Sequence, residues 1–189
     1  MLSPFWKFFA VAVILISVSR PVLAELMARP GTLATNPPGF RYPQHPQPLT
    51  RSSGYIFAGT VKSVERAAPK GNGVATVLVN FHVDQAMRGV RTGQTLAIRE
   101  WAGLWESGER YRPGERVLLF LYPPSKLGLT SPVGGPMGRF RIGPDGRVIF
   151  DPGRIGFLAP HPGIGGPLRG RTRVSPREFV RFLRLAEEE

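Results

Sequence analysis

Cysteine is absent from the 189 residues of this chain, and lysine is scarce, with 4 residues against 21 arginines. The absence of cysteine excludes a disulfide framework, thiol chemistry and a lipid-modified cysteine. The formal net charge is +12, which favours contact with polyanions or anionic membrane surfaces. The arginines are scattered along the sequence, which is more typical of a solvated surface than of a binding patch.

The chain also lacks an apolar run of the roughly 20 residues that a membrane-spanning helix needs. An apolar run at 8–18 follows Lys7 and precedes Val22 and Ala24, which suit positions −3 and −1 of a cleavage site. This order is typical of an export signal. We therefore predict a signal peptide at 1–24 and a periplasmic or secreted protein that does not span the membrane after cleavage. An uncleaved anchor is the alternative.

Proline and glycine dominate two segments in which apolar residues show no period. Residues 25–51 are proline-rich, and we predict a flexible, extended N-terminal arm there, acting as a spacer rather than as a proline-rich ligand. Residues 154–174 are rich in both glycine and proline and predict a loop. The periodic part of the chain lies between these segments, at 52–153.

Apolar residues alternate with polar ones through much of 52–153, which is the pattern of half-buried β-strands. The predicted strands lie at 55–65, 74–83, 93–101 and 113–124, and two short ones flank a Gly-Pro-Asp-Gly turn within 138–153. Residues 84–89 predict one helical turn. The unbroken apolar run 117–122 predicts a strand buried on both faces. Five or six antiparallel strands favour a mainly β fold, a small, partly open OB-like barrel.

One predicted strand carries a glycine, Gly59, in its middle, although glycine weakens a strand. Glycine is tolerated at bends and bulges because it adopts backbone angles that other residues cannot. We interpret Gly59 as the corner at which the first long strand bends into the barrel. A ligand that approaches the backbone is the alternative explanation.

The last residues, 175–189, predict an α-helix that begins with a capping motif. Ser175 can accept a hydrogen bond from the first turn, Pro176 suits the first helical position, and Glu178 can complete a capping box. The apolar side chains that follow share one face of the helix: Phe179, Phe182, Leu183 and Ala186. We expect this face to pack on the barrel, and binding to a membrane surface is the less favoured alternative.

Three stretches, YIFAGTVKSVE, VNFHVDQAMRGVRTGQTLAIRE and RPGERVLLFLY, follow one another between residues 53 and 150. Together they resemble bacterial exported domains with the netrin-module/TIMP-like OB fold. The resemblance implies a fold and an exported setting. Animal inhibitors with this fold place an N-terminal cysteine at the inhibited metal, so metalloproteinase inhibition does not carry over to this cysteine-free chain. An exported inhibitor of another protein's active site is a hypothesis by analogy of fold.

The sequence has little that points to catalysis or to a metal. His45, His82 and His161 are far apart and have no partner at metal-ligand spacing, and no nucleophile or phosphate-loop motif is present. Four glutamates fall in one region without a spacing that pairs them as general acid and base: Glu100, Glu106, Glu109 and Glu115. We predict no catalytic residue, no metal and no cofactor. An enzyme such as a hydrolase with an unrecognised site is the alternative.

Aromatic residues and arginines interleave in one segment, 99–116. The candidate ligand-binding residues are Trp101, Trp105, Arg110, Tyr111 and Arg112. Aromatic faces beside arginine can stack sugars or bases and hold anionic groups. The alternative, which we prefer, is that Trp101 ends a strand facing the core and Trp105 covers the barrel mouth, since aromatic residues usually cover apolar surface.

These observations favour a non-catalytic binding or interaction module of the cell envelope. The partners that suit an exported, basic protein are an anionic glycan, an envelope lipid or another envelope protein. Nucleic acid is not expected as a partner, because an exported protein meets little of it.

Overall fold

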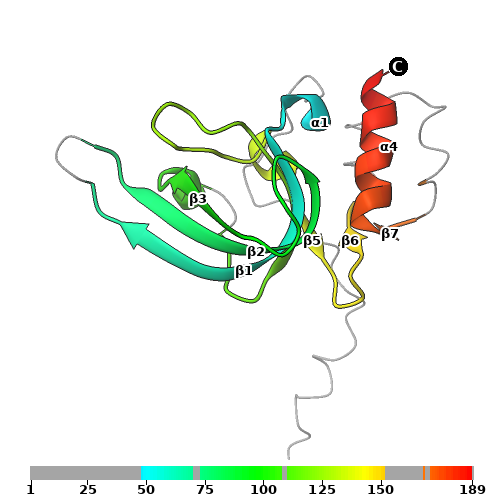
Figure 1. Ribbon diagram of the computed structural model, residues 1–189, viewed down its shortest axis with the longest axis horizontal. Helices are drawn as coiled ribbons and strands as arrows, with labels where there is room; N and C mark the ends of the chain where they lie inside the picture. The colour runs from blue at the N-terminus through cyan, green and yellow to red at the C-terminus, as the bar shows by residue number, and fades with distance from the viewer. Residues whose placement is uncertain (1–47, 70–72, 108–109, 152–167, 169–170, 189) are drawn as a thin grey trace, which may run out of the picture. The chain divides into compact units, whose positions relative to one another are not determined.

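A computed structural model describes residues 48–69, 73–107, 110–151, 168 and 171–188, which Figure 1 draws as ribbon or coloured trace. The predicted signal peptide, the predicted arm up to residue 47 and most of the predicted loop at 154–174 lie outside the described residues. His45, Glu109 and His161 lie outside them as well.

The fold is mainly β, as predicted, and consists of one antiparallel sheet of seven strands with a C-terminal helix (Figure 1). The strands are β1 (Tyr55–Ala67), β2 (Thr76–Arg88), β3 (Thr95–Trp101), β4 (Arg116–Leu121), β5 (Arg139–Ile142), β6 (Val148–Ile149) and β7 (Arg173–Val174). The helical elements are α1 (Leu49–Ser52), α2 (Leu104–Ser107), the 3-10 turn η2 (Gly135–Gly138) and α4 (Pro176–Glu188). The strand order is β3-β2-β1-β4-β5-β6-β7, so β1 pairs with both β2 and β4. The open sheet is consistent with a small, partly open barrel-like fold.

Two local predictions were wrong, because pairing with distant segments decides the structure there. Residues 84–89 do not form a helical turn, since β2 continues to Arg88 and pairs with β1 along this stretch. Register shifts between the two strands accommodate extra residues as bulges, and bulges bend a sheet. The other error concerns β7, which lies within the predicted loop and pairs with β6. A strand of two residues is too short to show a period of two in the sequence.

Gly59 lies at one of these register shifts, which falls between Ala58 and Gly59 and agrees with the predicted bend. Its φ is not positive, so the backbone angle does not require glycine here. The requirement is space, because a Cβ at residue 59 would lie 2.7 Å from the carbonyl oxygen of His82 and 3.1 Å from the Phe57 ring. Since His82 belongs to β2, the close approach is made by the neighbouring strand.

Two hydrophobic cores lie on the two faces of the sheet. β4 contributes to both by alternation, with Leu118 and Phe120 on one face and Val117, Leu119 and Leu121 on the other. This arrangement confirms the prediction of a strand buried on both faces. We call the two clusters the helix-covered core, which lies under α4, and the loop-covered core, which lies under the segment that connects β3 to β4.

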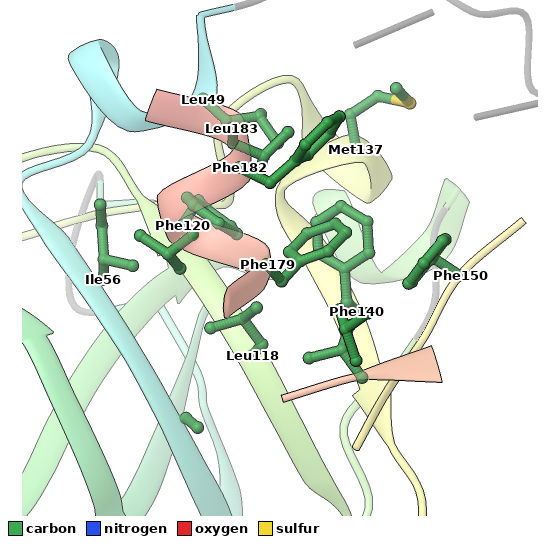
Figure 2. Close-up of a cluster of buried hydrophobic side chains, with 14 of the residues drawn as sticks. Leu49, Ile56, Leu118, Phe120, Met137, Phe140, Phe150, Phe179, Phe182 and Leu183 are labelled. Atoms are coloured by element: carbon green, nitrogen blue, oxygen red, sulfur yellow. The ribbon is translucent and has the colours of Figure 1, made fainter. Parts of the chain in front are cut away.

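The helix-covered core is built around aromatic side chains from the sheet and from α4, as Figure 2 shows. The ring centroids of Phe140 and Phe179 are 4.7 Å apart. The predicted apolar face of the helix is buried here. Its predicted cap is also present, because the backbone N–H of Glu178 donates to Ser175 Oγ at 3.3 Å. The helix therefore packs on the sheet, as expected from the sequence.

The last residues assigned to the flexible arm belong instead to the folded part of the chain. Leu49 and Thr50 are buried in the short helix α1. The carboxylate of Glu187, near the end of α4, accepts hydrogen bonds from the backbone N–H groups of Thr50 (2.8 Å) and Arg51 (3.0 Å). These are N–H groups that a first helical turn leaves without internal partners. The arm therefore ends before α1, which the far end of the chain holds in place.

Candidate binding site

A buried carboxylate, Glu100, lies at the centre of the candidate site. It is placed by the alternation of β3, in which Ile98 and Glu100 face the loop-covered core and Trp101 faces the other way. The side chain is almost entirely withdrawn from solvent, with 3% of the residue exposed. A buried carboxylate needs hydrogen-bond donors close by.

The donors come from the segment between β3 and β4, which folds back over the sheet. The indole N–H of Trp105, in α2, donates to Glu100 Oε2 at 2.8 Å, and the hydroxyl of Tyr111 donates to Oε1 at 3.2 Å. The Tyr111 ring packs edge-on against Phe81 of β2, with centroids 5.4 Å apart. Glu100 therefore fastens the connecting segment to the sheet at two points.

The protonation behaviour of this centre follows from its burial. Burial raises the pKa of Glu100, and the hydrogen bonds from Trp105 and Tyr111 and the charge of Arg139 oppose that rise. Burial, together with the neighbouring charge of Glu100, raises the pKa of Tyr111 well above its ordinary value. The phenol therefore stays protonated and acts as a donor.

A buried arginine extends the centre toward the surface. The guanidinium of Arg139, from β5, lies 4.2 Å from the centroid of the Tyr111 ring, in a cation–π arrangement. Its Nη2 donates to both carboxylate oxygens of Glu115, each at 2.8 Å, and to the backbone carbonyl of Arg110 at 3.3 Å. Arg139 thus joins β5 to the end of the connecting segment.

Exposed arginines lie near the Glu115 end of this network and on the strands beyond it. We define the arginine rim as Arg110, Arg112, Arg141 and Arg173, all of which are exposed. Arg112 donates its backbone N–H to Glu115 at 3.2 Å, and Arg141 Nε lies 3.8 Å from the same carboxylate.

Arg141 and Arg173 lie in one row across the sheet. Both residues are in register with Ile149, which lies between them on β6. The two arginines are therefore about 10 Å apart, the width of two strand spacings. Arg173 Nη1 also lies 3.6 Å from a carboxylate oxygen of Asp145. Ion pairs this long and this exposed are weak, so both guanidiniums can exchange partners with a ligand.

The structure does not gather the five predicted binding residues on one surface. Trp105 and Tyr111 are each only 4% exposed, and their rings contact protein. Their placement follows the alternative in which aromatic side chains cover apolar surface. Arg110 and Arg112 are exposed beside them, and Arg110 Nε donates to the carbonyl of Trp105 at 3.2 Å. Trp101 does not face the core, since it is 49% exposed on the opposite face of β3.

Sequence reasoning missed Arg139, Arg141 and Arg173 as neighbours of this site. No local signal links them to the segment 99–116, because Arg139 and Arg141 reach it through the pairing of β5 with β4, and Arg173 joins the row of Arg141 through the pairing of β7 with β6. One signal was present for Glu100, which occupies an inward position in the alternation of its strand. A charged residue at such a position indicates a buried polar centre.

The described residues hold no group of three or more histidines, cysteines, aspartates or glutamates that could bind a metal ion. Two of the four glutamates considered as catalytic candidates, Glu100 and Glu115, are engaged in the network above. Among the helices that the structure describes, none is both long enough and apolar enough to cross a membrane.

Comparisons of the chain with protein-family models, with curated proteins and with solved structures found no significant match.

Proposed function

We propose that this protein is a non-catalytic binding module of the cell envelope, which holds an anionic ligand against the arginine rim. The observation that carries this proposal is the group of exposed arginines near Glu115, where Arg141 Nε lies 3.8 Å from the carboxylate and Arg112 donates its backbone N–H to it. Guanidinium groups present several donors in a plane and bind carboxylate, sulfate or phosphate groups in pairs of hydrogen bonds. The exported setting and the netrin-module/TIMP-like resemblance are part of this proposal.

The buried network gives the rim a fixed geometry. Glu100 anchors the connecting segment through Trp105 and Tyr111, and Arg139 anchors it again at the carbonyl of Arg110. The backbone that carries the rim arginines is therefore ordered before a ligand arrives. Ordering in advance lowers the entropy that binding has to overcome.

The roles of the described carboxylates favour a binding module over a hydrolase. A general acid or base has to reach the substrate. Glu100 instead accepts hydrogen bonds from two buried side chains, and Glu115 is paired with Arg139. Both groups serve to hold the chain together. The ligand that suits an exported site of this kind is a polyanionic glycan, with repeated charges that can meet more than one rim arginine.

The experiment compares two pairs of arginine substitutions in the full chain. Arg112→Gln with Arg141→Gln removes two rim charges, and Arg177→Gln with Arg181→Gln removes two exposed charges from α4. Calorimetric titration with polygalacturonate at about 0.1 M salt should show roughly tenfold weaker binding for the rim pair and little change for the α4 pair. Binding should weaken strongly toward about 1 M salt, where the Debye length falls to roughly 3 Å.

The two pairs remove the same net charge, so the comparison separates a site from a general effect of charge. Equal losses of affinity in both pairs would contradict the rim as a site. Unchanged affinity in the rim pair, with its melting temperature preserved, would exclude the rim altogether.

A further inference from the structure

We propose that a second surface, at the end of β3, docks on a lipid bilayer that carries anionic lipids. We define this docking end as Val74, Trp101 and Leu104, with Arg99 and Lys126 near them. It shares no residue with the arginine rim and lies on another part of the sheet. The inference therefore goes beyond the binding function proposed above.

Three exposed apolar residues lie at the docking end. Trp101 is 49% exposed, Val74 is 52% exposed and Leu104 is 39% exposed. Trp101 pairs with Thr76 across the sheet, and the next hydrogen bond, from the N–H of Ala102 to the carbonyl of Ala75, measures 2.9 Å. The ladder therefore holds the chain before β2 beside the end of β3.

The exposed indole of Trp101 packs against Gly103. A Cβ at residue 103 would collide with the ring, at 2.6 Å from Cη2 and 2.7 Å from Cε2. The φ of Gly103 is not positive, so the need for glycine comes from the ring that rests on it. An indole that is half exposed and rests on the backbone loses less side-chain freedom on entering a bilayer than a fully free one.

Positive charge accompanies the apolar side chains. Arg99 precedes Trp101 by two residues and is exposed on the same face of β3. The loop that carries Lys126 is tied to β3, because Leu129 bridges to Arg99. Among the side chains described near this end, the exposed acid is Glu65, which lies in the same cross-strand row as Arg99, so Arg99 and Lys126 leave an excess of one positive charge.

A bilayer suits this combination better than a sugar or a protein partner. Tryptophan favours the boundary between headgroups and acyl chains, where short apolar side chains beside it can insert, and basic residues attract anionic headgroups. The exposed apolar residues Val74 and Leu104 near Trp101 suit acyl chains better than they suit a sugar. Three apolar side chains also give too small a patch for a stable protein interface.

The test follows the fluorescence of Trp101 in the full chain. The chain has three tryptophans, and Trp6→Phe leaves Trp101 exposed and Trp105 buried. Vesicles of phosphatidylethanolamine and phosphatidylglycerol with brominated acyl chains should quench this fluorescence and shift it to the blue. A further Trp101→Phe change should abolish most of the quenching, because Trp105 stays covered by protein. Vesicles of phosphatidylcholine should quench far less.

Two matched leucine substitutions then test whether Leu104 takes part, in chains whose N-terminal residues are identical. Leu104→Ser should raise the lipid concentration needed for half-maximal quenching of Trp101 about tenfold, since one inserted leucine is lost. Leu185→Ser changes an exposed leucine on α4 and should have no such effect.

Three results would overturn the proposal. One is vesicle binding without quenching of Trp101, which would assign the binding to other residues. The second is equal quenching by neutral and anionic vesicles. The third is quenching of Trp101 by soluble polygalacturonate but not by vesicles, which would make the surface a glycan site. The rim pair Arg112→Gln and Arg141→Gln should keep the vesicle response, so the two proposals fail separately.

Discussion

The two faces of the sheet are closed by different means. On one face an amphipathic helix, α4, covers an aromatic cluster that includes Phe140 and Phe179. On the other face an irregular segment covers the core and places Trp105 and Tyr111 over it. Two charged residues are buried in the described part of the chain, Glu100 and Arg139, and both lie on the loop-covered side.

The difference shows what each kind of cover requires. A helix satisfies its own backbone hydrogen bonds, so it can close a core with apolar side chains alone. An irregular segment has no such ladder, and here side-chain hydrogen bonds to Glu100 and from Arg139 fix it in place. The loop-covered side is therefore the side with ionisable groups in its interior and with an ordered polar surface above them.

The largest expected effect comes from the helix-covered core. Phe179→Ala removes a fully buried ring that contacts Phe140 and Phe150, and it should lower the free energy of unfolding by about 4 kcal/mol. Urea unfolding of the full chain measures the change, and Leu185→Ala on the exposed side of α4 is the control. A loss below about 1 kcal/mol would mean that the helix is not part of the core.

A smaller effect is expected in β1, which like β4 contributes side chains to both cores. Gly59→Val places side-chain atoms against the carbonyl of His82 and should destabilise the protein by about 2 kcal/mol through overpacking. Thermal melting measures this effect, with Ala97→Val at an exposed position of β3 as the control. If both variants melt like the wild type, the strands are not as close at Gly59 as described.

The cap of α4 contributes less than either of these. Ser175→Ala removes the acceptor for the N–H of Glu178 and should lower stability by about 1 kcal/mol. Ser175→Asp restores an acceptor and should recover most of the loss. If the two substitutions have the same effect on the urea midpoint, the hydroxyl does not act as a cap.

The smallest expected effect is on how the free energy of unfolding depends on pH. It concerns the loop-covered side alone. Burial raises the pKa of Glu100 above its ordinary value of 4.5. At pH values between 4.5 and the pKa in the folded protein, the folded chain therefore binds a proton at Glu100 that the unfolded chain has lost. The stability that Glu100 contributes is full below the ordinary value and is lost as the pH rises through the folded pKa.

Glu100→Gln should remove this loss because glutamine does not ionise. Urea unfolding at a series of pH values should therefore give a wild-type stability that falls relative to the variant as the pH rises above 4.5. Phe179→Ala, on the helix-covered side, should give a curve displaced from the wild type and parallel to it. Parallel curves for Glu100→Gln and the wild type would contradict a raised pKa at Glu100.

Much of the secondary structure follows from local sequence alone. Strand alternation predicted the positions of β1 and β3, and the unbroken apolar run predicted β4 together with its two buried faces. The motif at Ser175 predicted the start of α4 because a cap depends on residues adjacent in the chain. These features need no knowledge of distant contacts.

Other features depend on contacts that no local pattern encodes. The helix α1 was assigned to a flexible arm, because its buried position depends on Glu187 at the other end of the chain. The length of β2 depends on bulges against β1. The short strand β7 exists because β6 lies beside it.

The candidate site shows the same division most clearly in its two tryptophans. The sequence by itself determined that aromatic residues and arginines gather between β3 and β4, and that adjacent residues of a strand face opposite ways. Only the tertiary structure decided that Trp105 is buried against Glu100 while Trp101 lies exposed on Gly103. The physical reason is that an irregular segment takes its course from the hydrogen bonds and ring contacts it finds on distant strands, here with Phe81 and Arg139.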